Sequence, residues 1–400
     1  MEEETHAEEA REELHEESTT QERNLDAVHL LMTYRCTRSC SHCFHFGSPN
    51  NEQVMTAAQL KRYLKSIKSV PSVKWIFFEG GEPTLYFPLL IEGLKVAHEM
   101  GFHTAVVTNG FWIPSIRDMI PWLRQFRDVH LNLLQISVDE LHENTRLEPL
   151  QRDIVDAAGR AGMLCQFLGV SEPAPDDEPL EARRGATIVD GEIVYRGRAA
   201  HLLVEPQSKW LWSSFDECPH ENLMDPYRIH VEVYGHVMVC DGISIGNLGK
   251  NSLHEILEAY TPEEHPIVGP LLEGGPAQLA TTHEVKHKRG YVDACHLCYG
   301  IRRQLRKEFP RLLSPGILYG QEVSGKKRKT SRGGRGARGG RRSVEGRGGG
   351  QKRGSRDGHR NPASPKRAER REESQKLPGD TGHEKQPQNP KPHRGGSQET

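Results

Sequence analysis

The 400-residue sequence has no run of apolar residues long enough to cross a membrane as a helix. Its first thirty residues are acidic and lack the apolar segment of a secretory signal. These absences argue against a helical membrane protein and against a secreted one, so we expect a cytoplasmic protein. In that reducing compartment the eight cysteines are expected to bind metal rather than to form disulfides.

The sequence also has little net charge, only −2, but this value hides a strong asymmetry. Glutamate dominates residues 1–22, whereas arginine and lysine dominate residues 325–372. Segments so poor in apolar residues cannot bury enough surface to offset the entropy of ordering. We therefore predict a disordered acidic arm at 1–24 and a disordered Arg/Gly-rich basic tail at 322–400.

The segment from residue 25 to 209 alternates between short apolar runs and amphipathic stretches, which predicts βα units and a parallel sheet in an α/β fold. Strands are expected at Ala27–Tyr34, Val73–Phe78, Thr104–Thr108, Leu131–Val138 and Leu164–Val170, and Ala200–Val204 is a candidate sixth. A helix is expected after Thr56, which would be its N-cap. Further helices are expected at Phe87–Met100, Ser115–Phe126 and Leu150–Ala161. Residues 171–184, rich in proline and acidic side chains, are expected to form a loop.

Three cysteines, Cys36, Cys40 and Cys43, lie within eight residues on the loop that follows the first expected strand. On one loop, their thiolates can converge on a single point. Three thiolates suit a cubane cluster of four irons, because one iron keeps a position free for another ligand. The alternative is a zinc site in which His42 and His45 supplement two of the cysteines.

A second motif, Gly80-Gly81-Glu82-Pro83, ends the second expected strand. Two glycines let a ligand approach the backbone and would leave amide N–H groups free for it. The carboxylate that follows can pair with an amine. A plain β-turn is the alternative interpretation.

The third and fourth expected strands end in Asn109 and in Ser137 and Asp139. Site residues gather at the carboxyl ends of parallel strands, so these three are candidates for ligand contacts. Asn and Asp are also ordinary strand-terminating residues, and that alternative stays open.

The segment from 210 to 321 has a different pattern. Residues His230–Val239 alternate like a hairpin with its turn near Gly235, and helices are expected at Ser252–Tyr260 and Gly300–Phe309. Four cysteines could together ligate one cluster completely: Cys218, Cys240, Cys295 and Cys298. A structural zinc site with four thiolates is the alternative. The eighth cysteine, Cys165, is expected to be a buried core thiol.

The Cys-x3-Cys-x2-Cys loop, followed one strand later by Gly-Gly-Glu-Pro, resembles the radical S-adenosylmethionine (radical SAM) family. The residue before the third cysteine is usually aromatic in that family and is His42 here. The resemblance implies a partial (β/α)6 TIM-like barrel at 25–209. It also implies a small α+β domain similar to the SPASM or twitch auxiliary iron–sulfur domain at 210–321. No cysteine follows Cys298, so we expect one auxiliary cluster.

The resemblance further implies roles for these residues. The first three cysteines would hold a 4Fe-4S cluster with an open iron, and the last four an auxiliary 4Fe-4S cluster. The remaining candidates would contact S-adenosylmethionine: His42, Gly80, Gly81, Glu82, Pro83, Asn109, Ser137 and Asp139. A flavodoxin- or ferredoxin-type protein would supply electrons.

The implied reaction is reductive cleavage of S-adenosylmethionine to a 5′-deoxyadenosyl radical, which abstracts hydrogen from a substrate. The leading expectation is oxidation or cross-linking of a peptide or protein side chain. The first alternative is dehydrogenation of a small molecule such as an aminosugar. The second is a nucleic-acid-associated iron–sulfur protein whose Arg/Gly tail contacts phosphates without sequence preference.

Overall fold

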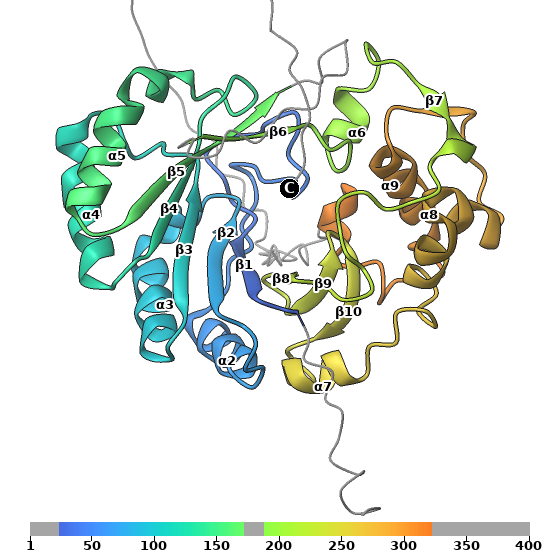
Figure 1. Cartoon of the computed structure of the whole chain (residues 1–400), viewed down its shortest axis with the longest axis horizontal. Coiled ribbons are helices and arrows are strands. Elements are labelled where there is room, and N and C mark those ends of the chain that lie inside the picture. The colour runs from blue at the N-terminus through green and yellow to red at the C-terminus, as the bar shows by residue number, and fades with distance from the viewer. Residues whose placement is uncertain (1–23, 172–187, 322–400) are drawn as a thin grey trace, which may run out of the picture. The chain divides into compact units, whose positions relative to one another are not determined.

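The computed structural model describes residues 24–171 and 188–321, which lie within one compact unit. The predicted acidic arm, the basic tail and nearly all of the 171–184 loop fall outside these residues. A nine-stranded sheet organises the described chain, in the order β10-β9-β8-β1-β2-β3-β4-β5-β6 (Figure 1). Strands β1 to β6 are parallel, β8 joins β1 in parallel, and β9 is antiparallel to both of its neighbours, β8 and β10.

The strands of the sheet are β1 Ala27–Thr33, β2 Trp75–Gly80, β3 His103–Thr108, β4 Leu133–Ser137, β5 Leu164–Ser171, β6 Ile188–Glu192, β8 Arg228–Val231, β9 His236–Cys240 and β10 Ile243–Asn247. A separate two-stranded ribbon pairs β7 Trp210–Leu211 with β11 Gly290–Tyr291.

The α-helices are α2 Ala57–Ile67, α3 Phe87–Glu99, α4 Ile116–Asp128, α5 Gln151–Arg160, α6 Ala199–Leu202, α7 Leu253–Glu258, α8 Val268–Thr282 and α9 Ala294–Leu305. Short 3-10 helices are η1 Pro83–Tyr86, η2 Thr145–Leu150, η3 Trp212–Ser214 and η4 Gly316–Tyr319. No helix in the described part of the chain is both long and apolar enough to span a membrane.

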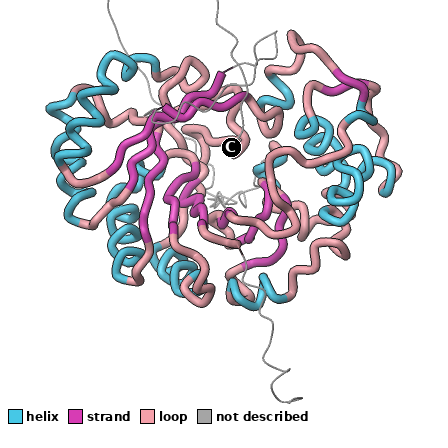
Figure 2. Tube along the Cα trace, in the orientation of Figure 1, coloured by secondary structure: helices cyan, strands magenta, loops and turns pink. Residues whose placement is uncertain are grey.

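Residues of β1 alternate between the two faces of the sheet. Val28 and Leu30 are fully buried toward the main core, under the helices α2 to α5 that cover one face of the parallel strands (Figures 1 and 2). His29 lies between them in the sequence and is only partly buried, as is Phe77, its partner in β2. The face opposite α2 to α5 therefore carries polar and aromatic side chains, as a ligand-binding face would.

Local signals in the sequence set several helix boundaries as predicted. Thr56 caps α2 in a capping box with Gln59, and Ser115 caps α4. Gly101 has φ +84° just after α3, where a left-handed residue ends the helix. The helix–strand alternation and the parallel sheet of the predicted α/β fold are thus confirmed.

The candidate sixth strand at Ala200–Val204 was wrong. That stretch begins as helix α6, in which the N–H groups of His201 and Leu202 donate to the carbonyl of Arg198. Two adjacent alanines favour a helical turn over a strand. The sixth parallel strand is β6, which pairs with β5 through Phe167 and Ile188.

The hairpin predicted near Gly235 is present as β8 and β9, and Gly235 has φ +83° in its turn. Strand β10 and helix α8 were not predicted. The predicted helix Gly300–Phe309 begins earlier, at Ala294, because Asp293 caps it by accepting a hydrogen bond from the N–H of His296 at 2.6 Å. The sheet continues from β1 into β8, so the domain division at 209/210 stays a prediction.

Candidate functional site

The first cysteine loop leaves the carboxyl end of β1 and folds back on itself. The Cys36 N–H donates to Ser48 O at 3.0 Å, which closes the loop at its base. A Cβ placed on Gly47 would lie 3.4 Å from Cys36 Cβ and 3.7 Å from Cys43 Sγ. The glycine thus lets both cysteines approach the same point, as their spacing predicted.

Burial, with a smaller contribution from neighbouring thiols, raises the pKa of Cys36 to about 11 and that of Cys40 to about 12. Three thiolates held this close repel one another unless a cation lies among them. The arrangement therefore fits a metal or a metal cluster, and the free protein would hold Cys36 and Cys40 protonated.

Arg198, at the start of α6, holds this loop from the opposite side. Its Nε donates to Cys40 O at 2.8 Å, its Nη2 to Gly47 O at 2.5 Å, and its backbone N–H to Cys43 O at 3.1 Å. The sequence analysis did not identify Arg198. No motif marks it, because 158 residues separate it from Cys40.

The two glycines at the end of β2 are needed because the backbone at the end of β1 lies too close for any side chain. A Cβ on Gly80 would lie 2.4 Å from Thr33 O, and one on Gly81 would lie 2.2 Å from Arg35 O. The N–H of Gly81 donates to Thr33 O at 2.6 Å, and that of Glu82 donates to Arg35 O at 2.8 Å. The expectation that the glycine N–H groups stay free for a ligand was therefore wrong for Gly81, whose N–H is already used by Thr33 at the end of β1.

The Glu82 carboxylate is completely buried where β2 and β3 end. It accepts hydrogen bonds from the Thr84 N–H and hydroxyl at 3.1 and 2.6 Å, from the Thr108 hydroxyl at 2.8 Å and from the Asn109 N–H at 2.7 Å. Burial raises the pKa of Glu82, and these hydrogen bonds only partly counter it. Pro83 begins η1 and is also buried. Glu82 therefore ties two strand ends together, and a contact with a substrate amine stays a prediction.

Asn109 joins this network to the cysteine loop. Its Nδ2 donates to Thr37 Oγ1 at 3.0 Å and approaches Cys36 Sγ at 3.5 Å. Asn144, which is fully buried, donates from its own Nδ2 to Asn109 O at 2.8 Å and to Ser137 O at 2.7 Å. The candidates Asn109 and Ser137 are thus brought together by Asn144, which the sequence analysis did not identify.

Asp139 and His42 are linked through His142. The Asp139 carboxylate accepts from the His142 N–H at 2.7 Å, lies 2.6 Å from His142 Nδ1, and accepts from the Val170 N–H at 3.1 Å. His142 Nε2 lies 3.3 Å from His42 Nε2. Burial lowers the pKa of His42 to about 4, so its ring is neutral at physiological pH. Both oxygens of Asp139 already have partners inside the protein.

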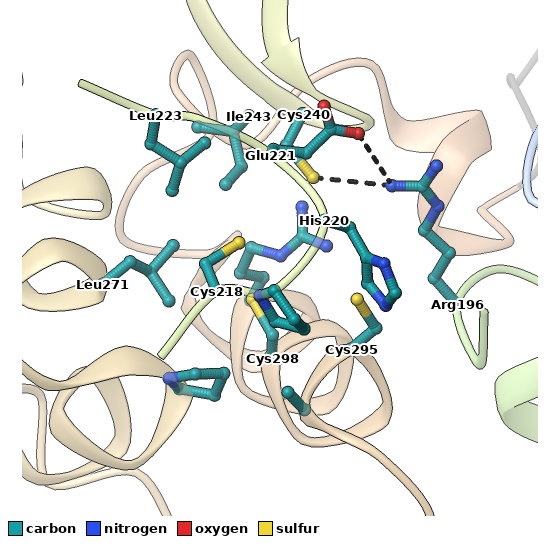
Figure 3. Close-up of a pocket in the computed structure, with 14 residues that line it drawn as sticks. Arg196, Cys218, His220, Glu221, Leu223, Cys240, Ile243, Leu271, Cys295 and Cys298 are labelled. Atoms are coloured by element: carbon teal, nitrogen blue, oxygen red, sulfur yellow. Dashed lines mark hydrogen bonds and ion pairs between the residues drawn. The ribbon is translucent and has the colours of Figure 1, made fainter. Parts of the chain in front are cut away.

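The second set of cysteines lines one cavity beside the end of β9 (Figure 3). Cys240 ends β9, Cys295 and Cys298 lie on the first turns of α9, and Cys218 comes from the loop before β8. Burial raises the pKa of Cys240 to about 12 and also raises the pKa values of Cys295 and Cys298. The four predicted ligands are therefore assembled in space from three separate parts of the chain.

Two arginines adjoin these thiols, the fully buried Arg302 and the partly buried Arg196. Arg196 Nη1 lies 3.7 Å from Cys240 Sγ, and its Nη2 pairs with Asp241 at 2.9 Å (Figure 3 shows the sulfur contact). Arg302 is only 1% exposed and donates to Asp241 O at 2.7 Å. Among the described residues no carboxylate forms an ion pair with Arg302, and its Nε lacks a hydrogen-bond partner.

A buried guanidinium is costly unless an opposite charge compensates it. The groups that can compensate Arg302 are the thiolates of Cys298, Cys240 and Cys295, together with the Tyr319 phenol. A metal or cluster with four thiolate ligands carries net negative charge and would supply that compensation. The sequence analysis identified these four cysteines but neither arginine.

Arg196 also connects the two cysteine sites. Its guanidinium lies 4.7 Å from the ring centre of Phe44, the residue after Cys43. The same guanidinium contacts Cys240 and Asp241. A single side chain therefore bridges the loop of the first site and the strand of the second.

Comparison with known proteins assigns the first of these sites to a family. Residues 30–161 match the family described as the Radical SAM superfamily. The match includes the first cysteine loop, the glycine motif and the ends of β3 and β4.

Two curated relatives match parts of the chain. An S-adenosylmethionine-dependent nucleotide dehydratase of Selenomonas ruminantium is 32% identical over 121 residues, which is 30% of this chain and 40% of that protein. The peptide biosynthesis protein YydG of Bacillus subtilis (strain 168) is 25% identical over 115 residues, which is 29% of this chain and 36% of that protein. The chain thus spans well under half of the length of these two relatives.

Among solved structures, native anSMEcpe with bound AdoMet is 13% identical, with a TM-score of 0.41 over 72% of this chain and 98% of that chain. The match of residues 30–161 to the Radical SAM superfamily thus covers the part of the chain that carries the first cysteine loop, and members of that superfamily use a 4Fe-4S cluster and S-adenosylmethionine.

Proposed function

We propose that the chain is a radical SAM oxidoreductase with two iron–sulfur sites, one open and one closed. Cys36, Cys40 and Cys43 would hold the open cluster. The closed auxiliary cluster would be held by Cys218, Cys240, Cys295 and Cys298. The observation that carries the proposal is the second site, where four thiols line one cavity beside the buried, positively charged Arg302.

At the first site, the thiols of Cys36 and Cys43 both act electrostatically on Cys40, as three thiols on one loop would. When bound there, a reduced 4Fe-4S cluster supplies the electron that cleaves S-adenosylmethionine to methionine and a 5′-deoxyadenosyl radical.

The chain's own residues would orient the cosubstrate and exclude water from it. Arg198 fixes the loop that presents the thiols, and Glu82 fixes the backbone of Asn109 beside Cys36. His42, Gly80, Gly81, Pro83, Ser137 and Asp139 would line the cosubstrate from the neighbouring strand ends. Because their backbone is held by internal hydrogen bonds, these contacts would be organised before binding.

At the second site, four thiolates would leave no iron open to substrate. This favours electron transfer over substrate binding, so a substrate radical formed at the first site could be oxidised through the second. Arg196 and Arg302 would stabilise the added negative charge of a reduced cluster. A structural zinc ion is the competing occupant, because four thiolates also suit zinc.

The substrate we favour is a peptide or protein side chain, which would be oxidised or cross-linked. The partial similarity to a protein named for peptide biosynthesis supports this choice. Dehydrogenation of a small molecule is the second candidate, supported by the similarity to a nucleotide dehydratase. A flavodoxin- or ferredoxin-type donor would supply the first electron in either case.

The test is anaerobic turnover of the reconstituted, reduced protein with candidate peptides, including any short peptide encoded next to its gene, and with small molecules in parallel. A peptide substrate should raise the yield of 5′-deoxyadenosine and lose the mass of hydrogen atoms. A Cys36→Ala/Cys40→Ala/Cys43→Ala control should form none. Turnover of a small molecule alone would overturn the peptide assignment, and no 5′-deoxyadenosine from any reaction would count against the enzyme activity.

The third class of function, nucleic-acid association through the Arg/Gly tail, stays a prediction, because residues 322–400 lie outside the described chain. Removing residues 322–400 should abolish retention of RNA at low salt if the tail binds phosphates. Unchanged retention would end this hypothesis.

A further inference from the structure

Three potential metal ligands meet on the sheet face that lies opposite α2 to α5. His29 comes from β1, Glu79 from β2 and His230 from β8, three strands that lie side by side (Figure 1). His29 Nδ1 lies 3.0 Å from one Glu79 oxygen, and His230 Nε2 lies 3.8 Å from the other. One ligand atom from each residue lies within 4.8 Å of the other two. Neither radical SAM motif includes any of the three.

The strand register explains why these residues meet. His29 and His230 are direct partners in the parallel pair β1–β8, so their side chains point to the same face. Glu79 is two residues beyond Phe77, the β2 partner of His29, and therefore shares that face as well. Three adjacent backbones thus hold the ligands in place without support from a loop.

The protonation of the cluster suits a cation. Burial alone would raise the pKa of Glu79, but His29 and His230 lower it to about 2, so the carboxylate is ionised at physiological pH. Burial lowers the pKa of His230 to about 4, which keeps its imidazole neutral and its lone pair available. His230 is only 7% exposed, and its Nδ1 has no hydrogen-bond partner.

We propose that His29, Glu79 and His230 bind one divalent first-row transition ion. Two imidazoles and one carboxylate on one side of an ion leave its other positions open, and this donor set suits zinc, iron and their neighbours in the series. The ordinary alternative is an ion pair between Glu79 and a protonated His29. That alternative leaves His230 Nε2 at 3.8 Å from Glu79, beyond hydrogen-bond distance, whereas a metal ion can occupy the space that the three donors share.

The position of the site relates it to the two cysteine sites. His45 Nε2 and Asp241 Oδ1 lie 3.4 Å apart, and both residues interact electrostatically with His230. His45 is two residues from Cys43, and Asp241 follows Cys240. The open positions of the ion would therefore face the region between the two cysteine sites, where they could hold an oxygen or nitrogen atom of a substrate.

The test is equilibrium dialysis of Co²⁺ against untagged protein that has been fully reconstituted with iron and sulfide, followed by elemental analysis. Loaded cysteines cannot compete for cobalt, so the proposal predicts one cobalt bound per chain. The variants are His29→Ala/His230→Ala and, as a smaller change, Glu79→Gln. His103→Ala is the matched control, because His103 lies at the exposed start of β3 and outside the cluster.

The double variant should lose the bound cobalt, Glu79→Gln should bind it at least about tenfold more weakly, and His103→Ala should bind it as the wild type does. Equal cobalt binding by the wild type and both cluster variants up to millimolar concentration, or none by the wild type, would overturn the proposal. Iron content measured in the same samples shows whether each variant has folded. Cobalt bound by any unloaded cysteines would be the same in all of these samples, so the difference between the wild type and the cluster variants carries the result, and it does not depend on turnover.

Discussion

The two cysteine sites differ in how their thiols are gathered and in what surrounds them. Cys36, Cys40 and Cys43 come from one loop, where Asn109 approaches Cys36 and the positive charges of Arg38 and Arg198 act on Cys40. The four thiols of the second site come from three parts of the chain and adjoin the partly buried Arg196 and the fully buried Arg302. In the proposed function, the open site has three thiols and leaves one iron free, whereas the closed site has four thiols and a buried arginine that compensates their charge.

The largest expected effect is at the second site. Arg302→Met removes a buried positive charge beside the thiolates and should cost about 3 kcal/mol or more of stability. It should also lower the iron bound at the second site while the first site keeps its cluster. Iron analysis and thermal denaturation measure both effects. Arg303→Met is the matched control, because Arg303 is the exposed neighbour on the same helix. An Arg302→Met protein with full iron content and unchanged stability would contradict the charge-compensation account.

The first site should depend on the support of its loop backbone by Arg198. Arg198→Ala removes side-chain hydrogen bonds to Cys40 O and Gly47 O and should cost about 2 kcal/mol. The spectral response of the reduced protein to S-adenosylmethionine should weaken. Arg124→Ala, an exposed change on α4, should alter neither property. If Arg198→Ala instead depletes the iron of the second site alone, the assignment of Arg198 to the first loop is wrong.

Two carboxylates, Glu82 near the first site and Glu221 near the second, allow the roles of the two sites to be compared. Glu82→Gln places an amide group against the donors of Thr108 and Asn109 and should raise the KM for S-adenosylmethionine about tenfold. Glu221→Gln disturbs a carboxylate that pairs with Arg228 and Arg196 near the second site, and it should leave this KM unchanged. Steady-state assays of 5′-deoxyadenosine formation compare them. Equal effects of the two substitutions would show that the sites do not have separate roles.

The smallest effect concerns pH and is shared by both sites. Burial raises the pKa of Cys36 from 9.0 to about 11 and the pKa values of Cys40 and Cys240 to about 12. The cluster-free protein should therefore be stabilised by these neutral thiols below pH 9.0 and lose that stability as the pH rises toward 12. Urea denaturation across this range tests it, with Cys40→Ser expected to flatten the loss. A stability that rises with pH over this range would show that folding does not raise the pKa values of these thiols.

Much of the fold followed from the sequence because local patterns determine it. The capping box of Thr56 and the left-handed Gly101 set helix ends without reference to the rest of the chain. The sixth strand was misplaced because β6 follows a segment without clear periodicity, and because the alanine pair of α6 lies within an apolar run. Helix α9 was started too late because the N-cap role of Asp293 was overlooked.

The site was predictable where residues form a motif or end a predicted strand. Both groups of cysteines form recognisable motifs, and the ends of the parallel strands indicated Asn109 and Ser137. Arg198 and Asn144 contact residues that are distant in the sequence, and no local sequence pattern predicts such contacts. The charges that accompany the second site likewise depend on tertiary packing, as the burial of Arg302 under Tyr319 shows.

The central claim, one open and one closed cluster, is tested most directly by anaerobic iron and sulfide analysis combined with EPR of the reduced protein. The account predicts about eight irons in the wild type and about four in either of two variants. The variant lacking Cys36, Cys40 and Cys43 should lose the signal that shifts on adding S-adenosylmethionine, and the variant lacking the four other ligands should keep it. Zinc without iron at the second site after reconstitution, or loss of the shift in both variants, would contradict the claim.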